Sequence, residues 1–100
     1  MKEARIYVDF NEMLEDDLVL LSKTDIKKDS HGKKVVLYES LSVKIYENDI
    51  NDFDEEDNLI AQGTVEFNTS TASWAKAAKW NCRINSNGIY NESYSCKIKS

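Results

Sequence analysis

The sequence predicts a mainly β protein, a small antiparallel barrel or roll of six to seven short strands with room for one short helix. Runs of alternating apolar and polar side chains recur along the chain. Turn-forming residues separate these runs at intervals of about 8 to 15 residues. A flat sheet of these strands would leave long free edges and one bare apolar face, which favours a closed arrangement. No linker or repeat interrupts the pattern, so one β-rich domain is expected over residues 1–100.

The N-terminal part begins with a predicted strand at 4–10, where Ile6, Val8 and Phe10 alternate with polar residues. Residues 11–22 leave two interpretations open. The apolar run 18–21 suits a strand buried on both faces. A helix would instead use Asn11 as its N-cap and the leucines at spacings i, i+4 and i+7, which are Leu14, Leu18 and Leu21.

A hairpin is predicted from about Leu18 to Glu39, because Asp29-Ser30-His31-Gly32 has the composition of a tight turn. Its second arm is 35–38. The β-branched and aromatic run 43–46 then indicates a further strand.

The second half of the chain contains the most regular strand pattern, over 59–68, after an acidic loop at 48–58. Gly63 lies in the middle of this strand and predicts a bulge or a sharp coil. Residues 69–79 are ambiguous, since one or two helical turns could form between 71 and 79. Alternation returns over 78–85, and Asn85-Ser86-Asn87-Gly88 predicts a closing hairpin with 89–93 as its return arm.

The composition limits the class of protein. Hydrophobic residues make up 41% and charged residues 31% of the chain, which is too apolar for a disordered protein and too polar for a membrane span. The net charge is −5, but residues 1–67 hold 8 basic and 17 acidic side chains whereas residues 68–100 hold 5 basic and 1 acidic. With no signal-peptide pattern, a cytoplasmic protein without membrane contact is expected.

The sequence contains few candidate catalytic residues. His31 is the only histidine and lies in a predicted turn. Cys82 and Cys96 fit neither a redox pair nor a zinc site, and a reducing cytoplasm favours free thiols over a disulfide between them. Cys82 is expected in the core and Cys96 in the tail. No nucleophile, phosphate-loop or dinucleotide motif occurs, so neither an enzyme nor a cofactor is predicted.

The acidic loop is the sharpest local feature, with six carboxylates between Asp49 and Asp57. An EF-hand starting at Asp52 fails, because Asp57 occupies the glycine position and Gly63 the position of the bidentate glutamate. A weak calcium site therefore stays only an alternative, and no metal ligand is assigned. The better hypothesis is a protein-binding surface, with Phe53 either an exposed anchor or folded back onto the barrel. Its candidate contacts are Asp52, Phe53, Asp54, Glu55, Glu56 and Asp57.

A basic aromatic segment at 74–83 supports a second hypothesis, a small barrel that binds single-stranded nucleic acid through cations and a stacking platform. The candidates are Trp74, Lys76, Lys79 and Arg83. The sequence pI of about 4.8 disfavours it. Trp80 is also expected in the core, because it lies on the same side of its strand as Cys82 and Ile84. The function predicted first is therefore a protein-protein interaction module, such as an adaptor, an inhibitor or an immunity-type partner. A free edge strand would also let a second copy of the chain pair with it.

Overall fold

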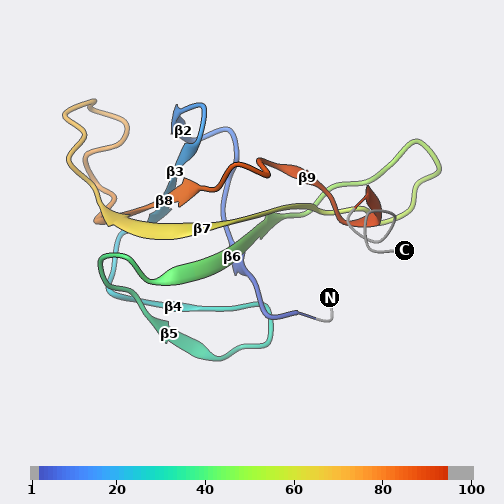
Figure 1. Ribbon diagram of the computed structural model, residues 1–100, viewed down its shortest axis with the longest axis horizontal. Coiled ribbons are helices and arrows are strands. Elements are labelled where there is room, and N and C mark those ends of the chain that lie inside the picture. The colour runs from blue at the N-terminus through green and yellow to red at the C-terminus, as the bar shows by residue number, and fades with distance from the viewer. Residues whose placement is uncertain (1–2, 95–100) are drawn as a thin grey trace.

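The computed structural model describes residues 3–94 and places nine β-strands among them (Figure 1). Six strands form the main path of one sheet, in the order β1-β6-β7-β8-β3-β2, and β9 pairs with β7 beside this path. β4 and β5 form a second, two-stranded sheet. The strands are β1 (Ile6–Tyr7), β2 (Met13–Glu15), β3 (Leu18–Ser22), β4 (Ile26–Lys28), β5 (Lys34–Val36), β6 (Ser42–Glu47), β7 (Leu59–Phe67), β8 (Trp80–Ile84) and β9 (Tyr90–Asn91).

The predicted mainly β fold is confirmed, but the large sheet curls into a half-barrel and does not close. A side chain from β4 bridges β1, at one end of this sheet, and β3, the last strand but one at the other end. The Lys27 ammonium donates hydrogen bonds to the carbonyls of Tyr7 at 2.8 Å and Leu21 at 2.7 Å. One pair of strands departs from the predicted antiparallel arrangement, because β1 pairs with β6 in parallel.

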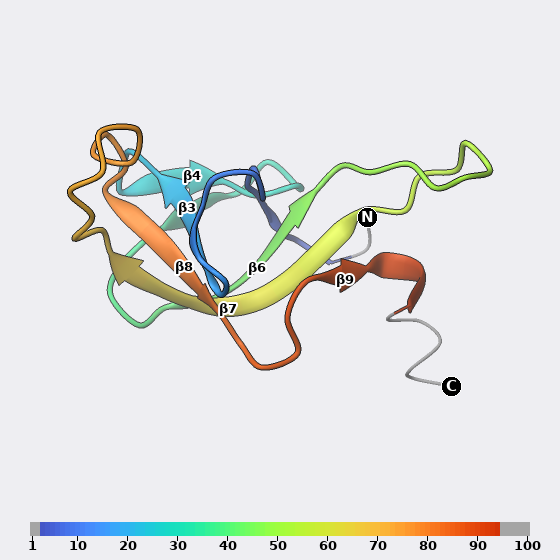
Figure 2. The same cartoon turned by 90° about the horizontal axis from the view of Figure 1, so that it is seen from above.

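The core fills the concave side of the half-barrel. Val43 and Ile45 of β6 are buried there. The alternation predicted over 59–68 is confirmed only for the middle of β7: Ala61 and Val65 are buried, but so is Ile60, and Phe67 is exposed. The β4–β5 sheet lies across the open side (Figure 2) and contributes Val35 to the packing. The other buried members of the cluster are Ile6, Val8, Val19, Leu21, Leu37, Trp80, Cys82 and Ile84.

Residues 11–22 form strands, not a helix. β2 and β3 make a short antiparallel hairpin. Each of the four residues from Leu18 to Leu21 is buried, which an amphipathic helix would not allow. The predicted hairpin from Leu18 to Glu39 was wrong in extent, because β3 pairs with β8 and β2. Only β4 and β5 surround the predicted turn, where Gly32 has a φ of +80°.

The turn at 85–88 is present, but the hairpin predicted from it was wrong. β8 and β9 both run antiparallel to β7, β8 along Gly63–Phe67 and β9 along Leu59 and Ile60. β8 and β9 therefore lie one after the other along β7 and run in the same direction, and the turn is part of the loop between them (Figure 2). The reason is that β7 has nine residues and β8 covers only part of that edge.

No helix forms at 71–79, where a series of turns is found, and residues 92–94 are helical. Within residues 3–94, no helix has the length and apolar character needed to cross a bilayer. Cys96 lies outside the described residues.

Candidate functional site: a projecting acidic arm

The predicted acidic loop is an ordered projection. Residues 48–58, called the acidic arm below, leave the body of the protein between β6 and β7 and extend along its long axis (Figures 1 and 2). Ile50 and Glu56 form an antiparallel bridge. Backbone hydrogen bonds from Asn51 N to Glu55 O and from Asp57 N to Asp49 O continue this pairing at 2.9 and 3.0 Å. The arm is therefore an irregular hairpin.

The tip of the arm is organised by Asn51. Its side-chain oxygen accepts hydrogen bonds from the backbone N–H groups of Phe53 and Glu55 at 2.9 and 3.1 Å. Asp54 has a φ of +59°, a left-handed conformation that aspartate tolerates better than most residues. This local network fixes the tip backbone without using any of the tip carboxylates.

The base of the arm is held by Asn58 and Asp57. Asn58 is only 2% exposed; its oxygen accepts from Asp49 N and its amide donates to the Glu56 carboxylate. The Asp57 carboxylate accepts from both the backbone N–H and the hydroxyl of Ser93, at 2.9 and 2.8 Å. Two predicted contact residues, Glu56 and Asp57, therefore serve the arm's own structure. Asn58 was not predicted, because its only signal in the sequence is a polar residue directly before an apolar strand.

The tip presents an apolar pair surrounded by carboxylates. Phe53 is 81% exposed and Ile50 is 66% exposed, so Phe53 does not fold back onto the half-barrel. Among residues 3–94, the carboxylates of Asp52, Asp54 and Glu55 have neither an ion pair nor a hydrogen-bond partner. The arm thus exposes one large aromatic side chain and three unneutralised charges.

Among the described residues, no group of three His, Cys, Asp or Glu side chains is placed so that it could hold a metal ion. In the arm the reason is geometric, because the hairpin spreads its carboxylates along two strands. The calcium alternative has no set of converging ligands there.

The basic segment does not gather its predicted residues into one surface. Trp74 and Lys76 are exposed on the turns after β7. Lys79 instead pairs with Asp25 at 2.7 Å, and the indole N–H of the buried Trp80 donates to the same carboxylate at 2.9 Å. These two hydrogen bonds lower the pKa of Asp25. Asp25 therefore stays charged, and the charge of Lys79 is neutralised within the protein.

Arg83 is the most heavily neutralised cation of that segment. Its guanidinium contacts the carboxylate of Glu66 on β7 and those of Glu15 and Asp17 beside β2, at 2.8 to 3.2 Å. These contacts raise its pKa above the ordinary arginine value. Three carboxylates around one cation leave a local excess of negative charge, which opposes contact with a phosphate backbone.

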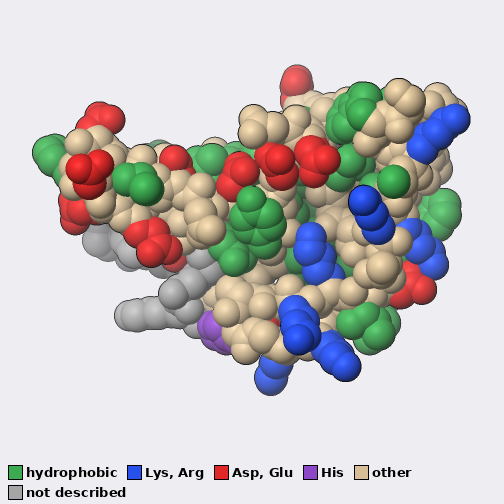
Figure 3. Space-filling model, turned by 180° about the vertical axis from the view of Figure 1, so that it is seen from behind, with side chains coloured by type: hydrophobic (Ala, Val, Ile, Leu, Met, Phe, Trp, Pro, Cys, Tyr) green, Lys and Arg blue, Asp and Glu red, His purple; other side chains and the backbone are tan. Residues whose placement is uncertain are grey.

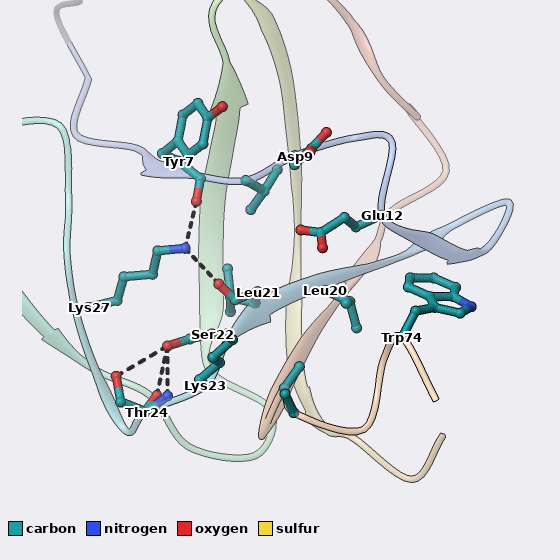
Figure 4. Close-up of a pocket in the computed structure, with 13 residues that line it drawn as sticks. Tyr7, Asp9, Glu12, Leu20, Leu21, Ser22, Lys23, Thr24, Lys27 and Trp74 are labelled. Atoms are coloured by element: carbon teal, nitrogen blue, oxygen red, sulfur yellow. Dashed lines mark hydrogen bonds between the residues drawn. The ribbon is translucent and has the colours of Figure 1, made fainter. Parts of the chain in front are cut away.

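Trp74 lines a groove that the sequence did not predict (Figure 4). The groove has a volume of about 490 Å³ and lies between β1 and β3. Tyr7, Glu12 and Leu20 form its walls, and Lys27 lies at one end with its pKa lowered by burial. Only the curling of the sheet in three dimensions brings these residues together.

Cys82 has no catalytic environment. Its thiol is fully buried, and burial raises its pKa to about 12. In a Cys96→Ser variant, we expect folded Cys82 to react with an aromatic disulfide reagent at pH 8 at least about 1,000-fold more slowly than in urea, because thiolate is the reactive species. The urea-unfolded sample provides the control and should release one equivalent. Comparable rates in both samples would show that the thiol is accessible.

Comparison of the chain with protein-family models, with curated proteins and with solved structures finds no match. The acidic arm combines the most exposed aromatic side chain with a hydrogen-bonded local backbone and unpaired charge.

Proposed function

We propose that this protein is a protein-binding module without catalytic activity, and that it recognises a basic partner through the tip of the acidic arm. The observation that carries the proposal is the 81% exposure of Phe53 on a hydrogen-bonded arm. Large exposed aromatic residues are enriched at interaction hot spots. A fixed tip reduces the ordering cost of binding.

The charge around Phe53 defines the partner's chemistry. Asp52, Asp54 and Glu55 surround the aromatic ring with negative charge that no described residue neutralises. Such a patch increases the association rate with a positively charged surface and disfavours acidic competitors. The expected partner therefore has an apolar recess large enough for a phenyl ring, with lysine or arginine side chains at its rim.

A photo-crosslinking amino acid at position 53 tests this proposal directly. On irradiation in native extract, we expect one predominant protein to be crosslinked in a nuclease-resistant manner. The matched control carries the same group at Trp74, which is 54% exposed but lies outside the arm. The same set of crosslinked proteins from both positions would contradict the proposal. Nuclease-sensitive products from position 74 would instead favour the nucleic-acid alternative.

Binding to the purified crosslinked partner then separates the two parts of the tip. We expect Phe53→Ala to weaken binding by at least about tenfold, mainly through faster dissociation. An Asp52→Asn/Glu55→Gln variant should slow association and remove most of its salt dependence. An Asp16→Asn/Glu92→Gln variant removes the same charge away from the tip and should bind like the unmodified protein. Unchanged binding by the tip variants would place the interface elsewhere.

A further inference from the structure

The outer face of the β4–β5 sheet has a composition opposite to that of the arm. Because alternate residues point to opposite sides of a strand, Lys27 and Val35 point inwards. The outward residues are two cross-strand pairs, Ile26 with Val36 and Lys28 with Lys34. We call these four residues the basic face.

The lysines of the basic face lack compensating charge. Lys28 and Lys34 are exposed, as is Lys33 in the adjoining turn, and none of the three forms an ion pair within residues 3–94. The nearby Asp29 carboxylate instead accepts the backbone N–H groups of His31 and Lys33. Figure 3 shows the cationic side chains gathered at the lower edge of the molecule, over this sheet. Like charges directly opposite each other destabilise a strand pair.

The basic face also exposes apolar surface. Ile26 is 50% exposed and Val36 is 59% exposed, and as cross-strand partners they form one continuous patch. The arm tip presents the complementary set: Ile50 and Phe53 with carboxylates around them. The two surfaces thus match both in charge and in apolar character, and both belong to the same chain.

We propose that the arm tip of one molecule binds the basic face of a second copy of this chain. An arm cannot reach the basic face of its own molecule, because it extends along the long axis away from the β4–β5 sheet (Figures 1 and 2). The contact joins two different surfaces, so it is heterologous, and repeating it produces open chains or a ring. The inference rests on the proposed function in one respect, namely that the arm tip is the recognition element in both.

The size of the two surfaces indicates a weak contact. A hairpin tip on a two-stranded face buries less than the roughly 1,200 Å² typical of stable complexes. Association is therefore expected at high micromolar to millimolar concentration and low salt, with dissociation as the ionic strength rises. Because the self-contact covers Phe53, it would compete with the partner and limit capture at high protein concentration.

Mixing two variants tests the head-to-tail geometry. The arm variant carries Asp52→Asn, Phe53→Ala and Glu55→Gln, and the face variant carries Lys28→Gln and Lys34→Gln. All five positions are exposed, so folding is not at risk. In sedimentation at low salt, we expect the average mass of the unmodified protein to rise with concentration from the 11.5 kDa monomer. Each variant alone should stay monomeric, and their mixture should form dimers of twice that mass and nothing larger.

Three results would overturn the inference. One is an unmodified protein that remains monomeric at millimolar concentration and low salt. Another is a mixture that stays monomeric although the unmodified protein associates, since that indicates a symmetric contact such as edge-strand pairing. The third is saturable binding of a mixed oligonucleotide or of anionic vesicles to the basic face of a monomeric protein.

Failure of this inference is distinguishable from failure of the proposed function. The mixing experiment needs no partner protein. The face variant has an intact arm and should give the same heterologous crosslink from position 53 as the unmodified protein. A heterologous crosslink from a monomeric protein would overturn only the self-contact. Self-association without any heterologous crosslink would overturn only the proposed function.

Discussion

Replacing Gly63 with alanine should destabilise the protein by about 3 kcal/mol or more, because an added Cβ has no space. That atom would lie 2.1 Å from the carbonyl oxygen of Arg83 and 2.9 Å from the sulfur of Cys82. The obstacle is mainly backbone, so β7 and β8 would have to separate at the centre of the sheet. For a domain of this size, the melting temperature should fall by more than about 10 °C.

The other two glycines provide the control for Gly63→Ala. Gly32 and Gly88 have φ values of +80° and +69°, but an added methyl group would meet nothing within 4 Å at either position. Alanine there should cost only about 1 kcal/mol, through backbone conformation alone. Chemical denaturation of the three variants would measure the difference. If Gly63→Ala cost no more than Gly88→Ala, close approach of the backbones would not be the reason for a glycine in β7.

Asn68→Ala should cost about 2 to 4 kcal/mol, because one side chain holds together the turns at 69–79. Its amide donates to the carbonyls of Ala75 and Ala78, each at 2.8 Å. Its oxygen accepts from Ser70 N and from the side-chain amide of Asn81. Asn81 is buried, and its own side-chain oxygen already lacks a partner. Losing Asn68 would remove four partly buried hydrogen bonds at once, although the Ala75 carbonyl would still accept from Ala78 N.

Denaturant unfolding measures this loss for Asn68→Ala, and limited trypsin digestion locates it. Cleavage after Lys76 should accelerate, since that lysine lies in the turns that Asn68 holds. Asn87→Ala is the matched control, because Asn87 is exposed and no hydrogen bond of its side chain is found among the described residues. Equal stability of the two variants, or unchanged cleavage at Lys76, would show that the turns are held by other contacts.

The candidate site was only partly predictable. A run of carboxylates interrupting the apolar pattern located the arm, and Phe53 was identified as its candidate anchor. The sequence did not reveal that Asp57 would be used internally, since its partner Ser93 becomes a neighbour only through the β7–β9 pairing. Glu56 binds the nearby Asn58 side chain, but nothing in the sequence indicated that Asn58 would be buried. It also did not reveal that Arg83 would be surrounded by Glu15, Asp17 and Glu66. Ion pairs between distant strands depend on strand order.

The sequence by itself determined the β class, the cores of most strands and the positions of the main turns, because side-chain alternation and turn chemistry are local properties. Tertiary structure alone decided the pairing. The signal at Asn87-Gly88 predicted a hairpin, but a local turn does not specify which neighbour the next strand will meet. The nine-residue β7 offers a longer edge than β8 covers, and β9 continues along that edge in the same direction as β8. The curling of the sheet was decided in the same way: the Lys27 ammonium binds carbonyls of β1 and β3, two strands that are not paired with each other and that no local pattern connects.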